Sequence, residues 1–238
     1  MKTKGKLYLS AAVSAIPVGK PIVFWDTCAI VEMLRLSERS VYPERDFNQY
    51  LYIADKIKNG ELISVTSELV FQEFNQHYAE ELKSLRMWEQ KHRELIKKIT
   101  AIMQNGPKRK RIEDGMDDMH TETRVTSTIS KIWRNTILIR EEKRFLQFAY
   151  TRLKHKMAPS QNKEQFKDSY IWGTFLYLAH SLPVHANLLF FTLNKKDYLV
   201  PNSSKLCPNI VTDLASLQNV ELHHVLGSLY GKINQLLP

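Results

Sequence analysis

Four short β-favouring runs, alternating with longer segments of helical periodicity, constrain the fold of this chain more than any other feature. The runs lie at residues 21–25, 61–66, 187–192 and 220–225. The runs at 21–25 and 187–192 are mostly apolar, which is typical of strands that are buried in a parallel sheet. The segments between them repeat apolar residues at steps of three and four, as one face of a helix does, for example Phe47, Tyr50, Leu51, Ala54 and Ile57. The sequence therefore predicts an α/β fold with three layers, α/β/α, around a mostly parallel central sheet.

A long basic segment interrupts this alternation. Its pattern predicts a helical insertion at residues 82–156 within a single domain of residues 1–238. One helix is expected to run from Glu68 to about residue 104 and another from about 127 to 156, with a flexible loop at about 106–124 between them. The insertion has 19 basic and 9 acidic residues, whereas the rest of the chain has 15 and 16. The net charge of +9 therefore originates in the insertion.

Charge and composition narrow the classes of partner. A strongly basic chain favours a polyanionic partner, and the sequence has no run of about 18 apolar residues that could cross a membrane. We therefore expect a nucleic acid as the partner, and no membrane. Cys28 and Cys207 show no zinc-ligand spacing and form at most one disulfide, so a cytoplasmic location is expected. The lysines and serine-interrupted apolar stretch at the N-terminus are not expected to be a cleaved signal peptide.

Polar residues stand where the predicted strands end. Asp26 directly follows the first strand, and Asn194 and Asp197 follow the strand at 187–192. Glu73 lies in the helix after the second strand, and Asp168 lies early in the helix before the later one. In open α/β sheets, ligands gather at the carboxyl ends of the strands, so we expect these five side chains to meet there.

The chemistry of this set favours a hard metal ion. Carboxylate and amide oxygens bind Mg²⁺ or Mn²⁺, and a set without cysteine or histidine disfavours zinc. Such ions activate water and neutralise the charge of a scissile phosphate. Each residue alone also has a structural explanation: a helix cap for Asp26, a helix-dipole partner for Asp168, a polar position between two phenylalanines for Glu73, and turn residues for Asn194 and Asp197.

Four segments carry these residues in a fixed order, at 22–30, 67–74, 166–172 and 189–198. Their order and context resemble the PIN-domain family of metal-dependent nucleases, in a larger form with a helical insertion. By this resemblance Asp26, Glu73 and Asp168 hold the metal, and Asn194 or Asp197 completes the site. Thr192 and Asn194 stand where many members have Thr or Ser and Asp or Asn.

The resemblance implies a nuclease that hydrolyses phosphodiester bonds, and an endoribonuclease in particular. An activated water would attack in line and leave 5′-phosphate and 3′-hydroxyl ends. The alternative is a catalytically inactive PIN-like protein that binds nucleic acid or acts as a scaffold, which the uncharged Asn194 favours. The candidate nucleic-acid contacts are Thr192 and a basic tetrad, Lys108, Arg109, Lys110 and Arg111. The helices of the insertion offer a surface for a homo-oligomer, and an antitoxin or a defence-system partner is compatible with the resemblance.

Overall fold

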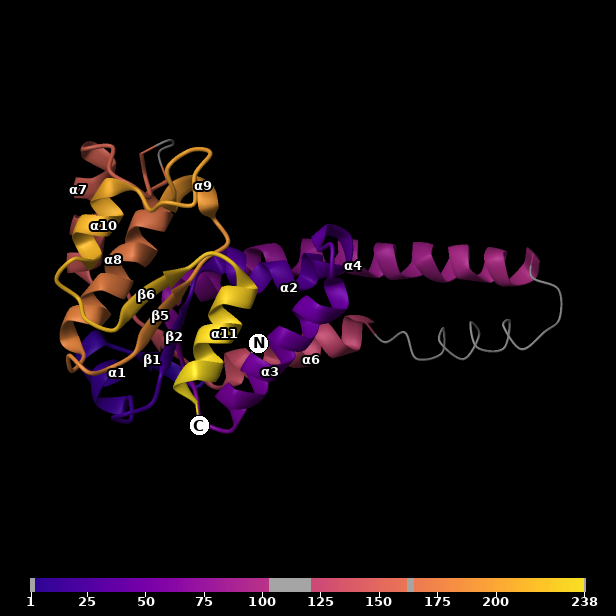
Figure 1. Cartoon of the computed structure of the whole chain (residues 1–238), viewed down its shortest axis with the longest axis horizontal. Coiled ribbons are helices and arrows are strands. Elements are labelled where there is room, and N and C mark those ends of the chain that lie inside the picture. Colours follow the sequence, from indigo (N-terminus) through magenta and orange to yellow (C-terminus); the bar gives the residue numbers. More distant parts are fainter. Residues whose placement is uncertain (1–2, 103–120, 162–164, 238) are drawn as a thin grey trace.

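A parallel sheet of six strands forms the centre of the computed structural model, which describes residues 3–102, 121–161 and 165–237 (Figure 1). The strands lie in the order β1 (Gly5–Leu7), β4 (Thr136–Ile139), β3 (Ile63–Ser67), β2 (Ile22–Trp25), β5 (Leu188–Phe191) and β6 (Val220–His223). Every neighbouring pair is parallel. The predicted fold class is confirmed.

The two central strands explain why their sequences are apolar throughout. All four residues of β2 and all four of β5 are buried. Phe24 pairs with Val65 on one side and with Phe190 on the other. A strand with helices on both of its faces needs apolar side chains in both directions, so alternation of polar and apolar residues is absent.

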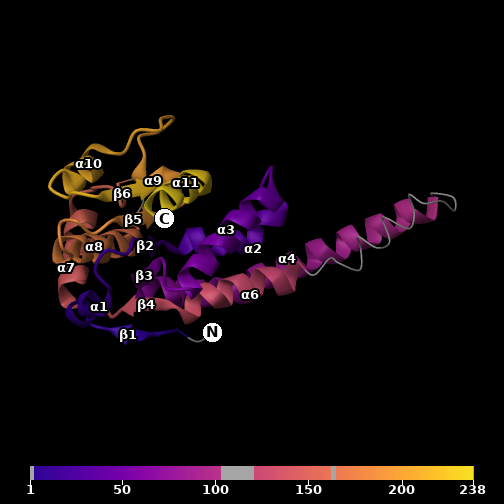
Figure 2. The same cartoon turned by 60° about the horizontal axis from the view of Figure 1, so that its bottom comes forward.

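Helices cover both faces of this sheet (Figure 2). One layer contains α2 (Thr27–Arg39), α3 (Pro43–Lys58), α4 (Glu68–Ile102), α6 (Thr121–Arg134) and α11 (Leu226–Leu236). The other contains α1 (Leu9–Ala15), α7 (Lys143–Lys154), α8 (Phe166–Ser181) and α10 (Pro208–Leu214). A short helix, α9 (Lys195–Tyr198), follows β5. Within the described ranges, none of the helices combines the length and the apolar character that a membrane crossing requires.

Helix α4 reaches far beyond the sheet. It has 35 residues, which corresponds to a length of about 52 Å at about 1.5 Å per residue. Its first half packs against α2 and α6, and its second half projects from the rest of the molecule (Figures 1 and 2). On the projecting half, Leu95, Ile99 and Ile102 are exposed. The predicted long helix is therefore present as α4.

The second half of the predicted insertion has a different structure from the one expected. We predicted one helix over residues 127–156, but the segment divides into α6, strand β4 and helix α7. Strand β4 lies between β1 and β3 in the sheet, and α7 packs against α8. The apolar residues of Thr136–Ile139 fit both periods, and no glycine or proline separates them from the helices. Residues 136–156 thus belong to the sheet and its helical layer.

Of the predicted loop at about 106–124, only residues 121–124 lie in the described ranges, and they are helical in α6.

Candidate active site

The candidate site lies where the order of the strands reverses. From β2 the chain continues to β3 on one side, and the later strand β5 lies on the other side of β2. Asp26 directly follows β2, and Thr192 directly follows β5. Such a switch point, at the carboxyl ends of parallel strands, is where open α/β sheets bind ligands.

Asp26 is buried and held by three donors. It is the N-cap of α2, and its Oδ1 accepts a hydrogen bond of 2.7 Å from the backbone nitrogen of Thr27. Its Oδ2 accepts from Thr192 Oγ1 at 2.6 Å and from Cys28 Sγ at 3.2 Å. Burial raises the pKa of Asp26, and the hydrogen bonds from Thr192 and Cys28 offset part of this rise. Capping and a site role are therefore compatible for this residue.

Glu73 connects three helices at this edge. It lies in the second turn of α4, and its Oε2 accepts from Thr27 Oγ1 of α2 at 2.6 Å. Its Oε1 lies 3.0 Å from Lys167 Nζ of α8. Both carboxylate oxygens of Glu73 thus have a partner.

Asp168 faces the other acids from the first turn of α8. Its pKa is raised to about 8, chiefly by burial and further by the negative charges of Asp26, Asp197 and Glu73, while Lys167 offsets part of this. Hydrogen bonds link the acids in pairs, since Thr27 donates to both Asp26 and Glu73, and the amide nitrogen of Gln165, turned toward the acids, donates to both Asp168 and Asp197. The structure therefore brings Asp26, Glu73, Asp168 and Asp197 to one place, as the order of elements predicted.

Asn194 and Asp197 are linked to each other and to the rest of the site. Asn194 Nδ2 donates to Asp197 Oδ2 at 2.6 Å, and the backbone nitrogen of Asn194 donates to Thr192 Oγ1 at 3.0 Å. With its amide nitrogen turned toward the acids, Gln165 donates to Asp197 Oδ2 at 2.6 Å and to Asp168 Oδ2 at 2.5 Å. Asp197 is 4% exposed, so its side chain is enclosed by these partners.

Three residues of this arrangement were not predicted from the sequence: Thr27, Gln165 and Lys167. Thr27 and Lys167 each stand next to one of the predicted acids in the sequence, which was the only signal available. Gln165 precedes α8 and has no sequence signal of its own. Hydrogen-bond partners of this kind depend on tertiary geometry rather than on local pattern.

Cys28 fits a packing role. Its Sγ donates to Asp26 and accepts from the backbone nitrogen of Leu193 at 3.1 Å. Burial and the charge of Asp26 raise the pKa of the Cys28 thiol well above its ordinary value. A thiol that stays protonated is a poor nucleophile, so Cys28 supports the position of Asp26.

The oxygen donors of this site fit a hydrated hard cation. Among the described residues, no three Asp, Glu, His or Cys side chains are arranged to hold one ion between them. Mg²⁺ in proteins keeps several waters and contacts only one or two carboxylates directly. The concentrated negative charge that raises the pKa of Asp168 is the environment that such an ion would neutralise.

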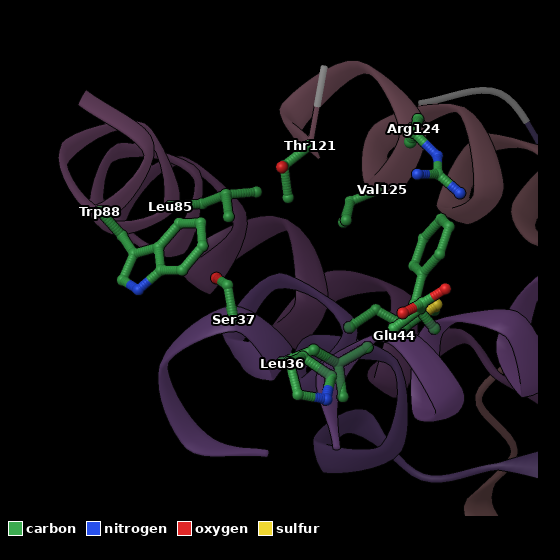
Figure 3. Close-up of a pocket in the computed structure, with 11 residues that line it drawn as sticks. Leu36, Ser37, Glu44, Leu85, Trp88, Thr121, Arg124 and Val125 are labelled. Atoms are coloured by element: carbon green, nitrogen blue, oxygen red, sulfur yellow. The ribbon is translucent and has the colours of Figure 1, made fainter. Parts of the chain in front are cut away.

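A separate apolar cavity lies at the base of the projecting half of α4. It has a volume of about 190 Å³ and is lined by Leu36 of α2, Leu85 and Trp88 of α4, and Val125 of α6 (Figure 3). The guanidinium of Arg124 lies 5.0 Å from the ring centre of Phe47 beside it. None of the predicted site residues lines this cavity.

The basic tetrad Lys108, Arg109, Lys110 and Arg111 lies outside the described residues. Its expected role in binding nucleic acid stays a prediction.

Comparison with known proteins gives one match. No similarity was found to a curated protein or to a solved structure. A model of the PIN domain matches residues 23–198, a range that begins in β2, ends in α9 and includes every acid of the site. This is well over half of the 238 residues. The chain belongs to the PIN-domain family.

Proposed function

We propose that this protein is a divalent-metal-dependent nuclease, and specifically an endoribonuclease. PIN domains are generally nucleases, which supports the broader statement. The observation that carries the proposal is the convergence of four carboxylates, from the N-cap of α2 and from α4, α8 and α9, in one hydrogen-bonded network at the switch point of the sheet. Clustered acids in a buried place repel one another, so a fold retains them where a cation binds.

The chain's own residues would divide the work as follows. Asp26, Glu73 and Asp168 would hold Mg²⁺ or Mn²⁺, one or two of them directly and the rest through waters of the ion, and Asp197 would complete the site. When bound, the ion supplies an activated water and offsets the charge of the scissile phosphate. Thr192 and Thr27 would keep the carboxylates of Asp26 and Glu73 in position through hydrogen bonds of 2.6 Å each.

Asn194 and Asp197 are assigned different roles. Because its amide nitrogen donates to Asp197, Asn194 would act through Asp197. We expect Asp197→Asn to raise the Mn²⁺ concentration for half-maximal cleavage by about tenfold or more, since one negative oxygen ligand is lost. Asn194→Ala should raise it by about tenfold, as the loss of a residue that orients a ligand does. Cleavage rates measured over a range of Mn²⁺ concentrations give this value for both variants. If neither variant differs from wild type, the site consists of Asp26, Glu73 and Asp168 alone.

The basic half of α4 and the tetrad are proposed as a further contact for the phosphate backbone. Replacement of Lys108, Arg109, Lys110 and Arg111 with serine should weaken binding to all sequences alike. Each lost phosphate contact should also flatten the log–log dependence of affinity on salt by about 0.7 for a single strand. Binding measured over a range of salt concentrations checks this, and a wild-type slope would exclude the tetrad from the interface.

A panel of labelled single-stranded RNA and DNA oligonucleotides, incubated with increasing Mn²⁺, tests the proposed function. We expect cleavage of RNA that requires the metal, stops with EDTA, and leaves 5′-phosphate and 3′-hydroxyl ends. Binding without cleavage at any metal concentration would favour the alternative, an inactive nucleic-acid-binding or scaffold protein. Cleavage of DNA alone would correct the substrate class.

A further inference from the structure

A groove opens directly beside the acids. It has a volume of about 810 Å³, and its lining includes Gln165, Asn194 and Asp197, which also belong to the acid site. Its remaining walls come from α9 and from the loop at 199–204. A ligand in this groove would therefore lie next to the carboxylates.

The loop that lines the groove is closed by its own backbone contacts. Leu199 and Leu206 form an antiparallel bridge, and the backbone nitrogen of Val200 donates to Lys205 O at 2.9 Å. Asn202 adopts a positive φ of 57° at the turn, a conformation that asparagine tolerates better than most residues. Such internal bonds fix the shape of the loop before any ligand binds.

The lining combines the groups that a nucleotide needs. Lys195 is an exposed residue of the lining. Burial lowers the pKa of His224, and the positive charge of Lys195 lowers it further. Ser204 offers an exposed hydroxyl group. Val200, which is 36% exposed, and Pro201 give an apolar surface on which a base can pack.

We propose that this groove binds the single-stranded nucleic acid next to the scissile phosphate, with Lys195 on a backbone phosphate. The inference rests on the proposed function, in which the scissile phosphate would lie beside the acids that adjoin the groove. Pockets of about 300–1,000 Å³ enclose ligands of small-molecule size, so this groove takes a few nucleotides of one strand. Bases that are not paired in a helix are the ones that proteins enclose in this way.

Two variants test the groove, and a third serves as the control. Lys195→Met removes a positive charge from the lining, and Ser204→Glu adds a negative one to it. Lys205→Met makes the same change as the first variant, in an exposed residue that does not line the groove. The probe is a 12-nucleotide fluorescein-labelled oligoribonucleotide of mixed sequence, and its anisotropy is measured with the full chain in Ca²⁺. A gel after each measurement verifies that the probe is intact.

Lys195→Met is expected to weaken binding about three- to tenfold and to flatten the log–log salt slope by about 0.7, the value for one phosphate contact on a single strand. Ser204→Glu should weaken binding by a similar factor, whereas Lys205→Met should change affinity less than twofold. A duplex of the same sequence should compete at least about tenfold more weakly than the single strand, because its bases are paired and stacked.

The groove assignment is overturned if the two groove variants bind as Lys205→Met does, or if the duplex competes as well as the single strand. The proposed function fails separately. If the wild-type protein shows this binding pattern but cleaves no oligonucleotide in Mn²⁺, the groove assignment stands and the proposed nuclease activity is wrong. If the protein cleaves in Mn²⁺ but both groove variants bind as wild type does, the proposed nuclease activity stands and the groove assignment is wrong.

Discussion

Replacing either Asp26 or Asp168 with asparagine is expected to reduce Mn²⁺-dependent cleavage by about 1,000-fold or more. Each change removes one negatively charged oxygen from the acid cluster. A metal ion bound by this cluster would contribute several kcal/mol to stabilising the transition state. Asparagine has nearly the same shape, and at residue 26 its Oδ1 can still accept the capping hydrogen bond from Thr27. The loss should therefore concern chemistry rather than folding, and initial cleavage rates at saturating Mn²⁺ measure it.

A matched control comes from the same helix as Glu73. Glu80 is an exposed acid of α4 one to two turns further along, so Glu80→Gln should cleave at the wild-type rate, whereas Glu73→Gln should not. If Asp26→Asn and Asp168→Asn both cleave at wild-type rates, the assignment of the site is wrong.

The second large effect is on stability without metal. The pKa of Asp168 is about 8 in the folded chain, against an ordinary value of 3.8, so the folded state binds this proton more tightly than the unfolded state does. Below about pH 4 both states are protonated. As the pH rises from about 4 to about 8, the unfolded chain releases the proton first, and the free energy of unfolding falls.

Asp168→Asn should remove this pH-dependent loss of stability, because asparagine has no carboxyl group to titrate. At pH 8 and without metal, we expect the variant to have a higher free energy of unfolding than wild type. The difference should be on the order of 5 kcal/mol, since the two pKa values differ by about four pH units and each unit is worth about 1.4 kcal/mol. Urea unfolding at pH 5 and pH 8 in EDTA measures it, with a smaller difference expected at pH 5. Added Mn²⁺ should stabilise wild type more than the variant, because the ion binds the folded state through the carboxylate of Asp168, which the variant lacks. A variant that is less stable than wild type at pH 8 would contradict the proposed charge cluster.

How far the sequence predicts this fold depends on the length of each element. The buried runs of β2 and β5 are apolar throughout and are bounded by Pro21 and Asp26 and by Asn187 and Thr192, so their ends and their strand-like length are clear in the sequence. Strand β1 has only three residues, which is too short for a pattern to develop. Strand β4 is hidden because its four residues continue the helical spacing of α6 and α7 on either side. Its place in the sheet comes from pairing with β3, which is a tertiary effect.

The clustering of the four acids was predictable for a different reason. Asp26 follows a strand of four buried residues, where a carboxylate needs a functional or capping explanation. Glu73, Asp168 and Asp197 could be recognised only from the order of the elements that carry them, since parallel strands bring their carboxyl ends to one edge. The sequence did not indicate that Lys167 pairs with Glu73, or that Gln165 reaches both Asp168 and Asp197. These contacts depend on how the start of α8 is placed against α4 and α9.

Crystals grown with Mn²⁺, measured where manganese scatters anomalously, test most directly whether this acid cluster is a metal site. We predict an anomalous peak in contact with a carboxylate oxygen of Asp26, Glu73 or Asp168, and the loss of that peak in Asp168→Asn at the same Mn²⁺ concentration. The contrary result is a wild-type crystal, at a Mn²⁺ concentration that supports cleavage, whose manganese binds elsewhere and leaves these three carboxylates without a peak.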